Sequence, residues 1–141
     1  MATCIPAILA SHRMTPTSAR RRRRLVRVTP PAALFGDLNA PGPYVVLMRW
    51  HPGYMSAPHT YTTGRVSMVL SGAWWVNSGA DFDPNNTVPV PAGGFVRRVA
   101  HTPHFDGVKR GARQPAVIAL FGLGPVDFHL MDPSKPAWRR V

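Results

Sequence analysis

Short apolar runs separated by glycine and proline dominate the pattern of hydrophobic and polar positions. Four runs rich in β-branched and aromatic side chains predict strands at residues 44–50, 66–70, 73–77 and 116–121. Shorter extended segments are expected at residues 88–90, 95–99, 104–108 and 126–130. No window holds an apolar i, i+3, i+4, i+7 stripe free of Gly and Pro, so no helix is predicted. The pattern favours an all-β protein, an antiparallel sandwich or barrel.

The length of the chain fits a single domain. Its 141 residues are enough to bury a core, and the single cysteine, Cys4, excludes an internal disulfide. No apolar run is long enough for a transmembrane segment. We expect a cytoplasmic protein, with targeting left open by the composition of the N-terminal segment.

The positive charge is concentrated at the N-terminus. Residues 1–29 contain seven arginines, five of them consecutive at residues 20–24, and no acidic residue. Like charges in such a block repel one another and stay solvated. We therefore predict a disordered leader at residues 1–29 and a folded domain at residues 30–141. The leader is compatible with a transit peptide, or with translated sequence upstream of a true start at Met14 or later.

The arginine run is a weak candidate for binding nucleic acid or an anionic membrane. It has no interleaved aromatic residues and no folded element around it, so we do not expect a specific site there.

Two polar pairs are the candidates for chemistry. His59 and Tyr61 lie two residues apart, so on a strand both side chains leave the same face. A second cluster, His101 and His104, follows about forty residues later, after a turn-rich segment. Strand-borne pairs of this kind can converge inside a small barrel.

The glycines around the first pair have the spacing of the first motif of the cupins. That motif runs from a glycine through five residues to His-x-His, then to a glutamate and, six residues later, a closing glycine. Here Gly53 is followed by five residues and His59, and Tyr61 stands at the second histidine. Arg65 stands at the glutamate, and Gly72 closes the motif.

The second cupin motif is matched at fewer positions. Gly93 and His104 agree with it, whereas Val99, His101 and Val108 replace its proline, glycine and asparagine. The resemblance covers residues 42–133. The chain resembles the small single-domain cupins of the conserved-barrel type, which implies a jelly-roll-like antiparallel β-barrel.

The resemblance also implies a divalent metal ion, which cupins hold on three histidines and a glutamate as Fe, Mn, Ni, Cu or Zn. His59 and His104 match two of these ligands, and Tyr61 is a conceivable phenolate ligand. His101 can reach the site from its loop as a third histidine. Arg65 has only donors and stays charged, so it cannot ligate a metal and is suited to clamping a carboxylate or phosphate.

For the remaining polar and aromatic residues a structural role is favoured over a functional one. We expect surface or hydrogen-bonded positions for His51 and His129, a solvated edge position for Asp127, and core or dimer-interface positions for Trp50, Trp74 and Trp75.

Three functions fit this sequence. The first is a metal-dependent enzyme of lyase, cyclase or dioxygenase type acting on a small organic substrate, with His104, Tyr61 and Arg65 at the reacting centre. The second is a metal-free barrel that binds an anionic small molecule through Arg65, with His59 or His104 as acid or base. The third is a non-enzymatic barrel whose basic tail recruits an acidic partner. A homodimer paired through edge strands is expected by analogy with cupins.

Overall fold

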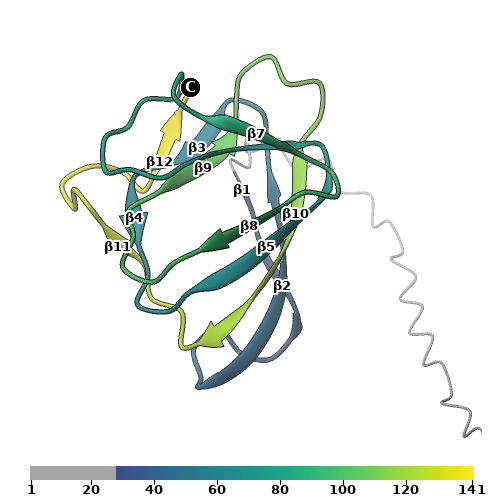
Figure 1. Ribbon diagram of the computed structural model, residues 1–141, viewed down its shortest axis with the longest axis vertical. Coiled ribbons are helices and arrows are strands. Elements are labelled where there is room, and N and C mark those ends of the chain that lie inside the picture. Colours follow the sequence, from purple (N-terminus) through teal and green to yellow (C-terminus); the bar gives the residue numbers. More distant parts are fainter. Residues whose placement is uncertain (1–27) are drawn as a thin grey trace, which may run out of the picture.

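Residues 28–141 form a barrel of antiparallel strands in the computed structural model, which describes this part of the chain (Figure 1). No helix occurs among these residues, and the prediction of an all-β antiparallel fold is confirmed. The predicted leader lies outside the described residues, except for Val28 and Thr29, which belong to the first strand.

The first large sheet has five strands, and its pairs are antiparallel. Along the central strands, side chains alternate between the barrel interior and the outside, as a period of two requires. In β2, Tyr44, Val46 and Trp50 are buried. The order across the sheet is β1 (Val28–Phe35), β2 (Gly42–Trp50), β10 (Ala116–Gly124), β5 (Arg65–Ser71) and β8 (Phe95–Arg98).

The second large sheet lies across the core from the first, and a short third sheet lies at its side (Figure 1). The second sheet has the order β12 (Trp138–Arg140), β3 (Tyr54–Ser56), β9 (Phe105–Val108), β6 (Ala73–Asn77) and β7 (Val88–Pro91). The short sheet pairs β11 (His129–Leu130) with β4 (His59–Thr60).

Both large sheets contribute to one apolar core. Its buried members are Tyr44, Val46, Trp50, Val69, Trp74, Val108, Ala116, Ile118 and Leu120. The inward-facing polar residues of β5, β8 and β9 lie beside this cluster. The fold therefore places a few polar groups in surroundings that are otherwise apolar.

Three strands, β1, β3 and β12, occur where the sequence pattern does not predict them. β1 covers the end of the predicted leader and contains Pro30 and Pro31, which are tolerated because β1 is an edge strand. β12 lies in the C-terminal segment that we expected to be irregular. The strand expected at residues 126–130 is limited to β11. No helix long and apolar enough to cross a membrane occurs in residues 28–141.

Candidate ligand-binding site in the barrel

Two histidines face each other where the short sheet meets the second large sheet. His59 and His104 form an isolated antiparallel bridge, with N–H···O distances of 2.9 Å from His59 to His104 and 3.0 Å in the other direction. Side chains of directly opposed residues leave the same face of a sheet. The two imidazole rings are accordingly neighbours, with 4.4 Å between their centroids, and both are buried.

Backbone carbonyls fix the orientation of both rings. Nδ1 of His59 lies 2.7 Å from the carbonyl oxygen of Ala57, and Nδ1 of His104 lies 2.9 Å from that of Thr102. A carbonyl can only accept, so each Nδ1 carries the proton and each neutral ring presents Nε2 as an acceptor. Burial lowers the pKa of His59, and lowers the pKa of His104 to about 4. Both rings are therefore neutral near pH 7.

Arg65 lies flat against Tyr61 beside this pair. Its Cζ is 3.2 Å from the centroid of the Tyr61 ring, which in turn contacts His59 edge-on at 5.0 Å between centroids. Stacking uses the face of a guanidinium and leaves its N–H edge free to donate. Within the described part of the chain, Nε and Nη2 of Arg65 are buried without a hydrogen-bond partner. Burial raises the pKa of Tyr61 to about 12, so its side chain stays a neutral phenol.

A second arginine lies beside Arg65 on the neighbouring strand, but its charge is compensated. Arg98 is the Cα partner of Arg65 in the β5–β8 ladder, and its Nη2 lies 3.1 Å from Oδ2 of Asp106. Its Nη1 donates to the backbone oxygen of Asn77 at 3.0 Å. With the histidines neutral, the charged groups at the site are two arginines and one aspartate. The site therefore carries one uncompensated positive charge, that of Arg65.

These residues line a cavity of about 40 Å³ inside the barrel. Its wall also contains Trp50, Ser67 and Trp74, whose indole N–H groups and hydroxyl have no hydrogen-bond partner among residues 28–141. Unpaired buried donors each cost roughly 1–3 kcal/mol. The wall is thus rich in donors that an acceptor-bearing ligand would satisfy.

Phe128, just before β11, covers His59, and the sequence pattern does not single it out as a site residue. Its ring stacks on His59 with 4.4 Å between centroids. Asp127 holds this segment in place, because Oδ1 accepts from the Thr62 backbone N–H at 2.9 Å and Oδ2 lies 2.9 Å from Nε2 of His129. Alternation along residues 126–130 predicts that Phe128 faces away from Asp127, but nothing in the sequence shows which residue Phe128 contacts.

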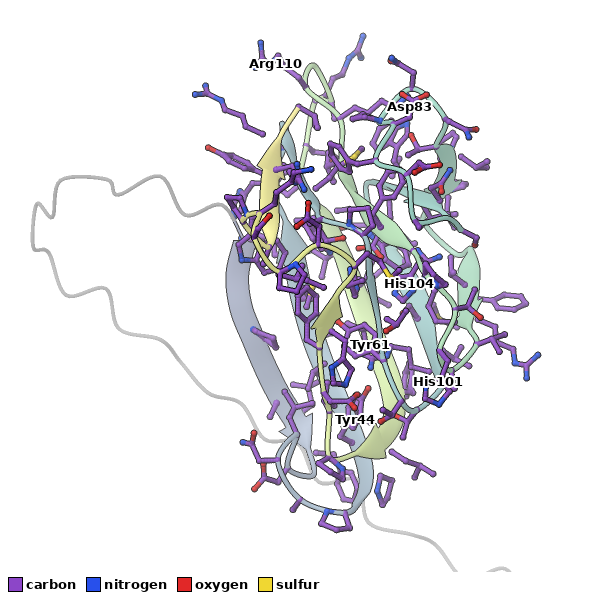
Figure 2. The ribbon with its side chains drawn as sticks, turned by 90° about the vertical axis from the view of Figure 1, so that its left-hand side faces the viewer. Tyr44, Tyr61, Asp83, His101, His104 and Arg110 are labelled. Atoms are coloured by element: carbon purple, nitrogen blue, oxygen red, sulfur yellow. The ribbon has the colours of Figure 1, made fainter. Side chains whose placement is uncertain are left out.

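The structure brings together most, but not all, of the predicted site residues. His59, Tyr61, Arg65 and His104 line one cavity. His101 is exposed on the turn before His104, with a positive φ of 59°, and is not part of the cavity wall. Figure 2 shows Tyr61 and His104 inside the barrel and His101 at its margin. Trp50 and Trp74 belong to the apolar core, as expected, and their side chains also form part of the cavity wall.

The residues present do not fit the four-ligand metal site that the cupin resemblance implies. His59 and His104 supply two imidazole nitrogens, Tyr61 keeps its proton, and the Arg65 guanidinium replaces the carboxylate. In residues 28–141, no group of three or more His, Cys, Asp or Glu side chains is arranged to hold a metal ion. A cation at the histidines would face the positive charge of Arg65. This donor set suits an anion better than a cation.

Comparison with known proteins identifies the fold. No protein-family model and no curated protein matches the sequence. The DMSP lyase DddQ from Ruegeria pomeroyi DSS-3 aligns with a TM-score of 0.63 at 14% identity, over 88% of this chain and 62% of that one. A conserved protein with a double-stranded β-helix domain from Klebsiella pneumoniae aligns with a TM-score of 0.55 at 19% identity, over 72% and 84% of the two chains.

A cupin superfamily protein from Desulfitobacterium hafniense DCB-2 gives a TM-score of 0.53 at 13% identity, covering 73% of this chain and 83% of that one. Identities this low establish the fold and leave the activity open. The chain has the double-stranded β-helix fold of the cupins, as the spacing of its glycines and histidines predicts.

Proposed function

We propose that the barrel binds a small molecule bearing a carboxylate, which Arg65 clamps, and that His59 and His104 exchange protons with this molecule. One observation carries the proposal: Arg65 is only 8% exposed and has no acidic partner. All six acidic residues of the chain lie between Asp37 and Asp132, so residues 1–27 cannot supply one. A buried charge without a partner is costly, and an anionic ligand is the simplest compensation.

The histidine pair gives this site a possible chemistry. Each Nε2 is a neutral proton acceptor in the cavity that Arg65 also lines. An anion bound at Arg65 would offset the positive charge and raise the pKa of both rings toward neutrality. The site then suits proton transfer at a position next to the bound carboxylate. One structural neighbour is a DMSP lyase, so in that protein a barrel of this fold supports an enzymatic activity.

The test compares Arg65→Met with Arg97→Met, whose arginine lies on the same ladder but is exposed on the outside. Small carboxylic acids and their uncharged amides are screened by calorimetry against the wild type. Carboxylates, and not amides, should bind. Arg65→Met should weaken binding roughly 10–100-fold, as expected for loss of charged hydrogen bonds. Arg97→Met should bind like the wild type.

The ligand-free protein gives a second readout. Arg65→Met removes a buried uncompensated charge and keeps most of the side-chain volume, so it should raise the free energy of unfolding by roughly 1–2 kcal/mol. An arginine with a structural role would give the opposite sign. Loss of stability in Arg65→Met, together with carboxylate binding equal to that of the wild type, would refute the proposal.

A second candidate is a metal ion held by His59 and His104 alone, favoured by the two adjacent Nε2 atoms that the backbone carbonyls leave free. Elemental analysis of protein purified without chelators separates the two candidates. The carboxylate proposal expects far less than one metal ion per chain. One ion per chain, lost in the His59→Ala/His104→Ala double variant, would favour the metal.

A further inference from the structure

The outer face of the first large sheet carries apolar side chains where polar ones are usual. On β5, Arg65, Ser67 and Val69 are buried, whereas Val66, Met68 and Leu70 are exposed. An antiparallel sheet with one face on the core normally turns polar residues outward. The outward pattern of β5 is therefore not explained by the barrel.

The strand register joins these side chains into two rows that cross all five strands. Adjacent members of each row are Cα partners in neighbouring strands. The first row consists of Phe35, Val45, Phe121, Val66 and Arg97. The second row consists of Ala32, Leu47, Ala119, Met68 and Phe95. Nine of these ten positions are apolar, so the face is continuous.

The exposed apolar area is large for a monomer. Phe95 is 69% exposed, Phe35 60%, Leu123 58%, Met68 44% and Phe121 42%. At roughly 200 Å² for a large side chain, these five together with Val66 (41%) and Leu70 (49%) expose on the order of 700 Å². This is above the roughly 300–600 Å² of the largest patch on a typical monomer. Each partner in a standard protein interface buries about 800 Å². The face is therefore of the size that a stable dimer needs.

The charges around the face indicate what covers it. Arg49 and Arg97 flank it, and its outward-facing residues include no acid. A charged partner would find no opposite charge at the centre, whereas a second copy brings an equal apolar area. If the two-fold axis runs along the strands, β8 of one copy covers β1 of the other. Arg97 then meets the partner's apolar edge, including the partner's Phe35, and the arginines do not oppose each other.

We propose that two copies of this chain pack face to face through the outer surface of the sheet β1–β2–β10–β5–β8. This contact differs from pairing through edge strands, because it uses side chains and leaves the strand edges unpaired. It is independent of the ligand site, since the outward residues of β5 lie on the opposite face from Arg65.

The test is the mass of the full chain in solution, by light scattering after gel filtration at about 50 µM. The wild type should have the mass of a dimer. Met68→Asp and Phe121→Asp place a charge in the centre of the face and should give monomers. Val88→Asp is the control, because Val88 is an exposed apolar residue on β7 of the other large sheet, and this variant should remain a dimer.

Circular dichroism checks that the variants are folded. If Met68→Asp does not fold, the milder variant Met68→Gln replaces it and should raise the dissociation constant of the dimer at least tenfold. A wild-type monomer would overturn the proposal, whether or not the protein then binds vesicles of anionic phosphatidylglycerol. A dimer that persists in all folded face variants would overturn it equally.

Discussion

Arg65 stands where the cupin motif has a glutamate, and this exchange reverses the charge that the site presents. The neighbouring groups are arranged in keeping with a positive charge at this position. Tyr61 stacks on the guanidinium, the two histidines are held neutral, and Asp106 is engaged by Arg98. Removing Asp106 would leave Arg98 as a second uncompensated buried charge, which is why that ion pair belongs to the architecture of the site.

The histidines should make the stability of the protein depend on pH. Their pKa values are lowered in the folded state, that of His104 from 6.5 to about 4. Between these values the unfolded chain binds more protons than the folded one, so stability falls as the pH falls from about 6.5 toward 4. For His104 the loss is at most roughly 3 kcal/mol. Urea unfolding at a series of pH values measures it.

His104→Gln should remove much of this pH dependence. The control is His129→Gln, because His129 is exposed and pairs with Asp127 outside the cavity. Equal pH dependence in the wild type and in His104→Gln would show that His104 does not carry the effect.

At the residue level, the sequence predicts the members of the site better than their roles. The motif spacing locates His59, Tyr61, Arg65 and His104, because each is fixed relative to a glycine that the barrel needs. It does not show that Phe128 covers His59, since that contact joins segments about seventy residues apart. His101 cannot be placed from spacing either, because its direction depends on a left-handed turn.

Among the elements, the turn between β5 and β6, which passes from one large sheet to the other, shows why the motif glycines are informative. Gly72 connects the two strands with a φ of +75°, and a Cβ there would collide with the backbone oxygen of Pro115 and lie 3.0 Å from Cα of Ala116. Only glycine combines this conformation with such a close approach. Gly72, one of the motif positions that identify the fold in the sequence, is thus required because β10 packs directly against this turn.

Alanine substitutions at two motif glycines should separate conformation from contact. Gly93 also has a positive φ, of +86°, but a Cβ there meets nothing within 4 Å. Gly93→Ala should lose only the cost of a left-handed residue, about 1–2 kcal/mol. Gly72→Ala adds the collision and should lose roughly 3–5 kcal/mol. Thermal unfolding measures both, and equal losses would contradict the packing of β10 against the turn.

The strands at the ends of the described chain were beyond sequence reasoning for a physical reason. β1 contains two prolines and follows a basic run, so its composition indicates an irregular segment. It becomes a strand because β2 offers a free edge, which is a tertiary property. Local pattern predicts β2 and β10, whose runs are apolar by themselves, and misses strands that exist only through their partners.

At the scale of the whole molecule, the apolar sheet face links stability to association. If two copies cover it, the folded dimer is favoured by mass action over the unfolded monomers. The melting temperature should then rise by several degrees when the protein concentration is increased about a hundredfold. Met68→Asp should melt at the same temperature throughout that range, as a monomer must. A wild-type melting temperature independent of concentration would contradict the link.

On the ribosome, β2 and β5 emerge long before β10, the strand that lies between them. β1 can pair with the outer edge of β2, and β8 with the outer edge of β5, as soon as each is synthesised. The two inner edges have to wait until residue 124 has left the exit tunnel. For most of its synthesis the nascent chain therefore carries an open core and two unpaired strand edges, the condition in which newly made proteins depend most on chaperones.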